Sequence, residues 1–190
     1  MSSDFAAARL NMVESQIRTA DVTDLPLQDA LRVVAREACV PAAKGYLAYA
    51  DAEVEYAPGR WLLRPRDVGK LLQNLKPRAG EKALAIAAPY AAAVLEAMGL
   101  SVERLDGDDL TAVKGGGYDV IICEGAARSA PASWTAALAV GGRLGLVERQ
   151  GPVGRATIYL RSSEGLGHRT AFDSTPPVMS GFAAEPGFAF

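Results

Sequence analysis

Histidine and cysteine are almost absent from the sequence, which has one histidine and two cysteines in 190 residues. His168 has no cysteine or second histidine at the spacing of a metal-ligand pair, so we expect no metal site. The same scarcity excludes a histidine-based catalytic triad that does not use His168. Cys39 and Cys123 lie far apart in apolar segments, which predicts free thiols, no disulfide framework and a reducing, cytoplasmic location.

Long hydrophobic runs and an excess of charge are also missing. The longest uncharged apolar run, 83–95, is shorter than the roughly 18 residues that a membrane-spanning helix needs. Residues 1–6 contain no basic stretch followed by an apolar one, so we expect no secretory signal. The formal net charge of −2 gives no electrostatic footprint for nucleic acid. We therefore expect a protein that neither inserts into membranes nor binds nucleic acid.

Glycine is missing where a cofactor-binding α/β domain would have its glycine-rich turn. Residues 83–87 form a short apolar run typical of a strand, Pro89 suits the first position of a helix, and Gly99 suits its end. Glycine lets such a turn adopt positive φ and approach a ligand closely, whereas a left-handed alanine costs roughly 1–2 kcal/mol. Proline has no N–H to offer an anion. With Ala87, Ala88 and Pro89 in the turn, the sequence predicts the fold of a cofactor-binding α/β domain without the turn that binds the cofactor.

The periodicity that is present is that of an α/β protein. It predicts helices over 4–19, 24–39, 65–75, 89–98 and 131–140. It predicts strands over 53–56, 60–63, 83–87, 101–105, 118–123, 142–148, 153–160 and 168–172. Strands that alternate with helices favour a doubly wound, mostly parallel, Rossmann-like sheet, and the last two strands favour an antiparallel hairpin at one edge.

The chain is expected to form one domain with three regions. These are a helical and loop region at 1–79, a Rossmann-like core at 80–150, and antiparallel strands with a tail at 151–190. The tail is broken by proline and glycine and carries Met179, Phe182, Phe188 and Phe190. This aromatic spacing favours a tail that crosses an apolar surface, and a recognition element for a partner is the alternative.

Three short motifs precede the α/β region in a fixed order. They are Met12-Val13-x-x-Gln16-Ile17, Val34-Ala-Arg36-Glu37-Ala-Cys-Val40-Pro41 and Ala48-Tyr49-Ala-Asp51. In this order they resemble the N-terminal part of the protein-L-isoaspartate O-methyltransferase family. Downstream, Tyr118-Asp-Val-Ile-Ile and the segment around Gly141-Gly142 resemble the fourth and fifth strands of an S-adenosylmethionine-dependent methyltransferase. The resemblance implies a seven-stranded methyltransferase sheet that ends in an antiparallel hairpin.

The departures from that family fall where its cofactor binds. The family's loop Gly-Thr-Gly-Ser-Gly-Tyr corresponds here to Ala87-Ala88-Pro89-Tyr90, which is shorter and free of glycine, and the acid on the preceding strand becomes Ala85. The segment 106–117 is too short for the helix and strand that the family has there. We therefore expect the sheet to lack one edge strand beside 101–105. An unprotected edge invites pairing, so this edge should be exposed or form a homodimer, and should not be covered by the tail.

The family's substrate loop and acidic positions are altered as well. Its loop Gly-Gln-Thr-Ile-Ser-Gln-Pro corresponds to Gly59-Arg-Trp-Leu-Leu-Arg-Pro65, where Trp61 and Leu63 replace hydroxyl residues. Leucine cannot make the hydrogen bond by which a hydroxyl positions a carboxylate. Asp106 stands where the resemblance places the acid that binds ribose, and a merely solvated acid is the alternative. Glu124 is a second carboxylate at the carboxyl edge, and pairing with an arginine is its alternative role.

Two functions of different classes follow. The resemblance implies an enzyme that uses S-adenosylmethionine to esterify isoaspartyl-containing proteins in protein repair. The losses favour a non-catalytic relative that keeps the fold and acts on an unknown protein partner. In that interpretation no residue is catalytic and no cofactor is bound. Four positions, Ala87, Pro89, Tyr90 and Asp106, would then be vestiges of the cofactor site.

Overall fold

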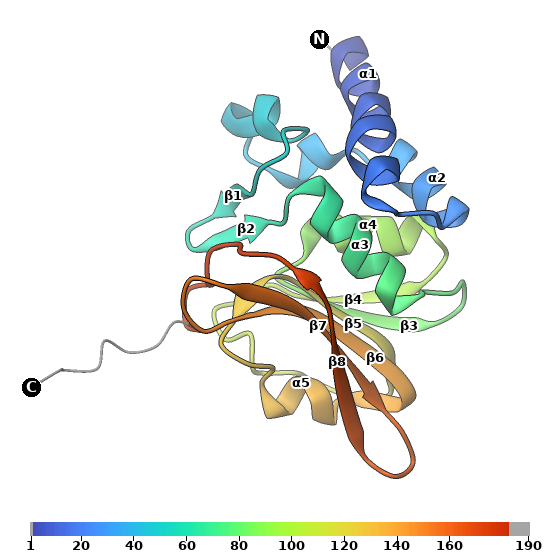
Figure 1. Ribbon diagram of the computed structural model, residues 1–190, viewed down its shortest axis with the longest axis vertical. Coiled ribbons are helices and arrows are strands. Elements are labelled where there is room, and N and C mark those ends of the chain that lie inside the picture. Colours follow the sequence, from blue (N-terminus) through green and yellow to red (C-terminus); the bar gives the residue numbers. More distant parts are fainter. Residues whose placement is uncertain (1, 183–190) are drawn as a thin grey trace, which may run out of the picture.

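The computed structural model describes residues 2–182 and has helices on both faces of a six-stranded sheet, α1 to α4 on one face and α5 on the other (Figure 1). The helices are α1 (Ser2–Met12), α2 (Leu25–Val33), α3 (Pro65–Leu75), α4 (Pro89–Ala97) and α5 (Ala132–Ala136). The strands are β1 (Val54–Ala57), β2 (Arg60–Leu62), β3 (Lys82–Ile86), β4 (Ser101–Leu105), β5 (Tyr118–Ala127), β6 (Leu138–Arg149), β7 (Gly154–Arg161) and β8 (Leu166–Asp173). In this part of the chain, no helix has the length and apolar character needed to cross a membrane.

The main sheet has the strand order β4-β3-β5-β6-β7-β8. Neighbouring strands from β4 to β6 are parallel, whereas β7 runs antiparallel to both β6 and β8. This confirms the mostly parallel sheet with an antiparallel hairpin that the alternation of strands and helices predicts. Among the described residues β4 pairs with β3 alone, so the sheet has six strands and lacks the edge strand whose loss the short segment 106–117 indicates.

The outer edge of the sheet, formed by β4, has charged side chains and no further strand beside it among the described residues. Glu103 forms an ion pair with Lys82 at 3.0 Å, and Arg104 forms one with Glu96 at 2.8 Å. Both β4 side chains are exposed. The described part of the tail pairs with β5, so it leaves this edge uncovered, as expected.

Two of the predicted helices are present in altered form. The helix predicted over 4–19 is α1 followed by a π-helical turn, Val13–Ile17, and a 3-10 turn, Arg18–Ala20. The helix predicted over 131–140 is shortened to α5. Residues after α5 already belong to β6, in which Leu138 pairs with Tyr118.

The prediction of one helix over 24–39 is wrong in its second half. Asp24 caps α2 through its carboxylate, which accepts the N–H of Leu27 at 2.9 Å, but the helix ends at Val33. The chain is then extended through 34–35 and forms a separate 3-10 turn, Arg36–Cys39. This break turns the Arg36 side chain into the interior, where it is fully buried.

The alternation of side chains along β3 divides the apolar core between the two faces of the sheet. Ala83 and Ala85 face the layer of α1 to α4, whereas Leu84 and Ile86 face the side that holds Trp134 of α5. α3 lies close to the sheet at Gly145, because a Cβ atom there would stand only 3.0 Å from Leu71 Cδ1.

A bulge near the end of β5 sets the direction of the side chains that this strand places at the carboxyl edge. Ile122 pairs with Gly145 and Ala126 with Val147, so β5 advances four positions, from 122 to 126, while β6 advances two, from 145 to 147. Bulges of this kind redirect side chains at the ends of strands. Here the bulged segment contains Glu124, whose side chain is fully buried.

Candidate functional site

The turn from β3 into α4 lies at the carboxyl edge of the parallel strands, where open α/β sheets hold ligands. Ala87 has a φ of +45°, the left-handed conformation that glycine adopts without strain. Its N–H donates to the carbonyl of Leu105 at 2.9 Å, and its side chain is fully buried. Pro89 begins α4 without an N–H, and Tyr90 is fully buried. The turn therefore has the left-handed conformation expected of a glycine-rich turn. The Ala87 N–H is already bonded to Leu105, however, and the side chains of Ala87 and Tyr90 are buried, so neither is available to a ligand.

We expect Ala87→Gly to be less destabilising than Ala85→Gly by about 1–2 kcal/mol, because only Ala87 is held in a left-handed conformation. Both alanines are buried on or beside β3, so the loss of a methyl group and the added backbone freedom are similar in the two variants. The free energies of unfolding from urea titrations measure the difference. Equal costs would show that Ala87 is not strained.

Beneath the start of α4, Glu124 acts as a cap supplied from another element. Its Oε2 accepts the N–H of Ala91 at 3.1 Å, a role that the N-cap residue Ala88 has no polar side chain to fill. The position that the resemblance assigns to an acid on β3, Ala85, is buried among apolar residues and contributes no charge. The buried carboxylate at this edge is therefore that of Glu124 in β5, and it caps the N-terminus of α4.

Arg36 is the arginine with which Glu124 pairs. Its Nη1 lies 3.8 Å from Glu124 Oε1, and its guanidinium carbon lies 4.7 Å from the centre of the Tyr90 ring. Its Nε donates to the carbonyl of Ala48 at 2.7 Å and its Nη2 to that of Leu63 at 2.5 Å. Arg36 thereby joins the N-terminal region to the first turn of α4 and to the segment after β2.

Burial raises the pKa of Glu124 to about 7, against the opposing effects of Arg36 and of the backbone N–H of Ala91. A carboxyl group whose pKa is raised on folding stabilises the native state below its unfolded value near 4.5, and that contribution is lost as the pH rises through 7.

We therefore expect the wild-type protein to gain about 1–2 kcal/mol relative to Glu124→Gln when the pH falls from 8 to 5.5. The glutamine variant cannot titrate at this position, so the difference between the two proteins removes the contribution of other groups. Urea titrations at the two pH values provide the measurement. A pH-independent difference would place the pKa of Glu124 outside this window.

Asp106 is held by the small hairpin of β1 and β2. The Tyr56 hydroxyl donates to its Oδ1 at 3.1 Å, and Arg60 Nη1 lies 3.3 Å from the same oxygen. Arg60 Nη2 also donates to the carbonyl of Gly107 at 2.7 Å. Burial and the nearby Asp106 raise the pKa of Tyr56, so its hydroxyl remains a donor. The carboxylate at the expected ribose position is therefore exposed but bound by residues of the chain.

The segment that corresponds to the substrate loop, 59–65, has no hydroxyl side chain. Leu63 is fully buried, and Trp61 is half-buried within β2, where it pairs with Glu55. The hydroxyl positions of the family are thus an apolar core residue and an aromatic strand residue.

The tail crosses the carboxyl edge between the hairpin and β5. The Met179 N–H donates to the carbonyl of Ala126 at 2.9 Å, and the Ser180 N–H donates to that of Gly59 at 3.1 Å. Met179 is fully buried, with its sulfur 3.8 Å from that of Cys123. The expectation that the tail crosses an apolar surface is confirmed for its described part, and Phe188 and Phe190 lie outside the described residues.

Phe182 extends this contact to the far face of the sheet. Its ring lies 5.5 Å from that of Trp134 in α5. Gly125 gives Met179 its space, because a Cβ atom there would stand 2.6 Å from Met179 Cγ. The end of β5, where a ligand would approach an open sheet, is therefore packed with side chains from the tail.

The sequence points to Ala87, Pro89, Tyr90 and Asp106 but not to the residues that contact them. Ala87, Pro89 and Tyr90 form one turn, whereas Asp106 follows the neighbouring strand and faces the hairpin. Arg36 had a signal, since it is a charged residue within an apolar motif. Among residues 2–182 no group of three or more histidine, cysteine, aspartate or glutamate side chains is placed to hold a metal ion.

The N-terminal motifs also contact one another. Arg9 and the Tyr49 hydroxyl both bind Glu37, and Gln16 Nε2 donates to the carbonyl of Tyr49 at 2.9 Å. The three motifs thus form one polar network that holds the N-terminal helices against the turn of Arg36. Their shared residues have a structural role.

Comparisons with known proteins agree on the family. The chain is 30% identical over 171 residues to protein-L-isoaspartate O-methyltransferase 1 of Rhodopseudomonas palustris, a match that covers 75% of this chain and 70% of the relative. It is 37% identical over 105 residues to the protein-L-isoaspartate O-methyltransferase of Methylorubrum extorquens, covering 54% and 46%. The homologue from Methylorubrum populi is 38% identical over 102 residues, covering 53% and 48%. The chain spans about half the length of these last two relatives. No family model matches it.

Two solved structures share the fold. One is described as a protein-L-isoaspartate O-methyltransferase from Plasmodium falciparum in complex with S-adenosyl-L-homocysteine; its TM-score is 0.73 at 13% identity, covering 90% of this chain and 97% of that one. A second, titled protein-L-isoaspartate O-methyltransferase, has a TM-score of 0.71 at 15% identity, covering 91% and 66%. At such low identity these matches show the fold of the chain.

Proposed function

Because the chain belongs to the protein-L-isoaspartate O-methyltransferase family, we propose that it is a non-catalytic member that keeps the methyltransferase fold without binding S-adenosylmethionine. It would act through a protein partner. The observation that carries this proposal is the filling of the carboxyl edge by the chain's own side chains. Ala87, Tyr90 and Met179 are all fully buried there.

The chemistry of methyl transfer explains why this filling matters. Transfer from a sulfonium to a carboxylate depends on proximity, in-line orientation and electrostatic positioning, so it needs a shaped pocket more than it needs catalytic side chains. The turn at Ala87 uses its amide for Leu105 and offers no glycine cradle. The residues present therefore do not fit the methionine part of the cofactor.

Substrate positioning is weakened at a second, independent place. Leu63 lies in the core, where it can make no side-chain hydrogen bond to a carboxylate. Each lost hydrogen bond of this kind is worth roughly 1–3 kcal/mol, so the two losses together should reduce catalysis by several kcal/mol.

An active, divergent protein-L-isoaspartate O-methyltransferase is the alternative. The names of the relatives favour it, and so does the exposed Asp106 at the end of β4. In that case S-adenosylmethionine would be the cofactor and an isoaspartyl-containing protein the substrate.

Calorimetry and methyl transfer distinguish the two functions. We expect no binding heat with S-adenosylmethionine or S-adenosylhomocysteine at millimolar concentration, and no transfer of labelled methyl groups to an isoaspartyl peptide. The relative from Rhodopseudomonas palustris serves as the positive control in both assays. Robust transfer that depends on the wild-type chain would overturn the non-catalytic proposal.

A further inference from the structure

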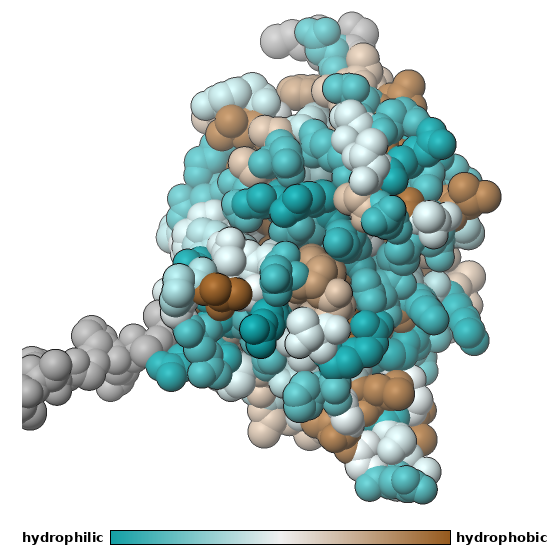
Figure 2. Space-filling model, in the orientation of Figure 1, coloured by the Kyte–Doolittle hydropathy of each residue, from teal (hydrophilic) through white to brown (hydrophobic). Residues whose placement is uncertain are grey.

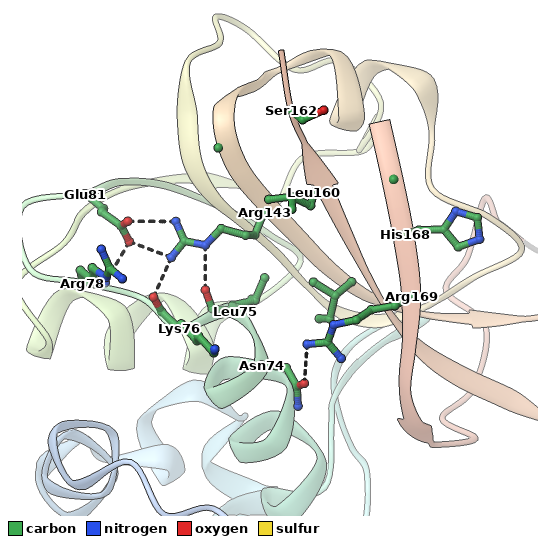
Figure 3. Close-up of a pocket in the computed structure, with 13 residues that line it drawn as sticks. Asn74, Leu75, Lys76, Arg78, Glu81, Arg143, Leu160, Ser162, His168 and Arg169 are labelled. Atoms are coloured by element: carbon green, nitrogen blue, oxygen red, sulfur yellow. Dashed lines mark hydrogen bonds and ion pairs between the residues drawn. The ribbon is translucent and has the colours of Figure 1, made fainter. Parts of the chain in front are cut away.

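A pocket of about 630 Å³ lies at the C-terminal end of α3, at the edge of the sheet where β3 and β6 begin (Figure 3). α3 ends at Leu75, and Lys76 follows with a φ of +49°. The strands of the sheet continue past this point, where Leu160 of β7 pairs with Arg143 on one side and with Gly167 on the other. The pocket exists because the helix stops before the strands that it covers.

Basic side chains surround this pocket. Arg143 neutralises Glu81, the one acidic residue of its described lining, at 2.9 and 3.1 Å, and its Nε donates to the carbonyl of Leu75 at 2.8 Å. Arg169 Nη2 donates to the side-chain oxygen of Asn74 at 2.9 Å. Figure 3 shows Arg143 and Arg169 on either side of the helix end.

The side chains of Lys76 and Arg78 at the rim form no ion pair among the described residues, although the Arg78 backbone N–H donates to Glu81 Oε2 at 2.9 Å. Within residues 2–182, neither the Lys76 ammonium nor the Arg78 guanidinium lies within 4 Å of a carboxylate oxygen. Both residues are exposed. The single acid of the lining is already neutralised, so the pocket carries an excess of positive charge that is available to a ligand.

The wall on the sheet side is apolar. Ile158 and Leu160 project from β7 into the pocket, and Leu160 is 49% exposed. Figure 2 shows hydrophobic surface near the lower end of the molecule, bordered by hydrophilic residues. His168 does not add to this wall, because the centre of its ring lies 5.4 Å from that of Tyr159 and the side chain points away from the other lining side chains (Figure 3).

We propose that this pocket binds a small organic anion with an apolar body. Its carboxylate, phosphate or sulfonate would lie between Lys76 and Arg78, and its apolar part would lie on Ile158 and Leu160. The volume falls within the range of small-molecule sites, roughly 300–1,000 Å³, and such sites combine an apolar wall with a few convergent polar groups. This site is independent of the carboxyl edge and of the function proposed for it.

The probe for this site is 8-anilinonaphthalene-1-sulfonate. The control is N-phenyl-1-naphthylamine, which has the same aromatic body without the sulfonate. We expect saturable binding of the sulfonate to the folded protein, followed by fluorescence titration. The double variant Lys76→Gln/Arg78→Gln should weaken that binding by about tenfold, because two charge-assisted contacts are lost. Binding of the uncharged probe should not change. Equal effects on both probes, or no saturable binding, would overturn the proposal.

A matched pair of tryptophan variants locates the site. A side chain at Gly167 enters open space on the face that it shares with Leu160, so Gly167→Trp should occlude the pocket and abolish binding of both probes. Thr170→Trp places the same side chain on the opposite face of β8 and should leave binding unchanged. Circular dichroism confirms that both variants are folded. Loss of binding in both variants, or in neither, would contradict the assignment.

Discussion

Replacing Arg36 with alanine is expected to lower the free energy of unfolding by about 3–5 kcal/mol at pH 8, the range found when one partner of a buried ion pair is removed. Glu124 would remain fully buried without its cation, and the carbonyls of Ala48 and Leu63 would lose their donors. Urea titration followed by circular dichroism measures the effect. A loss below about 1 kcal/mol would show that the pair contributes as little as an exposed one.

Two further variants separate the buried charge from the general loss of a side chain. In Arg36→Met/Glu124→Leu no charge is left buried, so this double variant should recover most of the stability that Arg36→Ala loses. Arg32→Ala is the matched control, because Arg32 pairs with Glu14 and Asp29 at the surface, where solvent screens the interaction. It should change stability little. A double variant as unstable as Arg36→Ala would mean that the loss of packing, and not the buried charge, accounts for the lower free energy of unfolding.

Met179→Ala is expected to lower the free energy of unfolding by about 2–5 kcal/mol, the range for truncation of a fully buried methionine. Because Met179 contacts Cys123 through sulfur, the same change should expose that thiol. In a Cys39→Ala background Cys123 is the one remaining thiol, and its rate of reaction with a disulfide reagent should rise several-fold. An unchanged rate would place the tail away from β5 in solution.

Gly125→Ala approaches the same contact from the other side. A Cβ atom at this position would lie 2.6 Å from Met179 Cγ and Sδ, so the methionine must move or the tail must lift. We expect the same increase in Cys123 reactivity. Val140→Ala removes an exposed hydrophobic side chain and serves as the control that should leave the thiol protected.

The order of strands and helices in this chain could be predicted because it depends on local patterns. The apolar run at 83–87, the proline at 89 and the glycine at 99 mark one strand and one helix without reference to the rest of the chain. The missing edge strand could be predicted from the family resemblance, because 106–117 is too short for the helix and strand that the family has there. The same pattern placed Ala87 in the turn between this strand and this helix, but the φ of +45° that Ala87 adopts there is seen in the structure alone.

The contacts of the candidate site could not be predicted from local patterns. Arg36 continues the helical periodicity of α2, so the break after Val33 becomes visible only through its distant partners at Leu63 and Glu124. The bulge that buries Glu124 has no marker either, because the apolar run of β5 passes through it. The tail was expected to cross an apolar surface, but its position over β5 depends on the space at Gly125.

The crossing of the tail also bears on the order in which the protein folds. Ser180 and Gly59, which share a hydrogen bond, are separated by 121 positions along the chain (59 to 180). Closing so long a loop is entropically costly, and both surfaces that receive the tail must already exist before it can dock. We therefore expect the tail to dock after the other described segments and to be able to leave its position while the sheet stays folded. Hydrogen exchange should be faster at the amides of Met179 and Ser180 than at Ile122 within β5, so that the carboxyl edge opens transiently in a protein that is otherwise native.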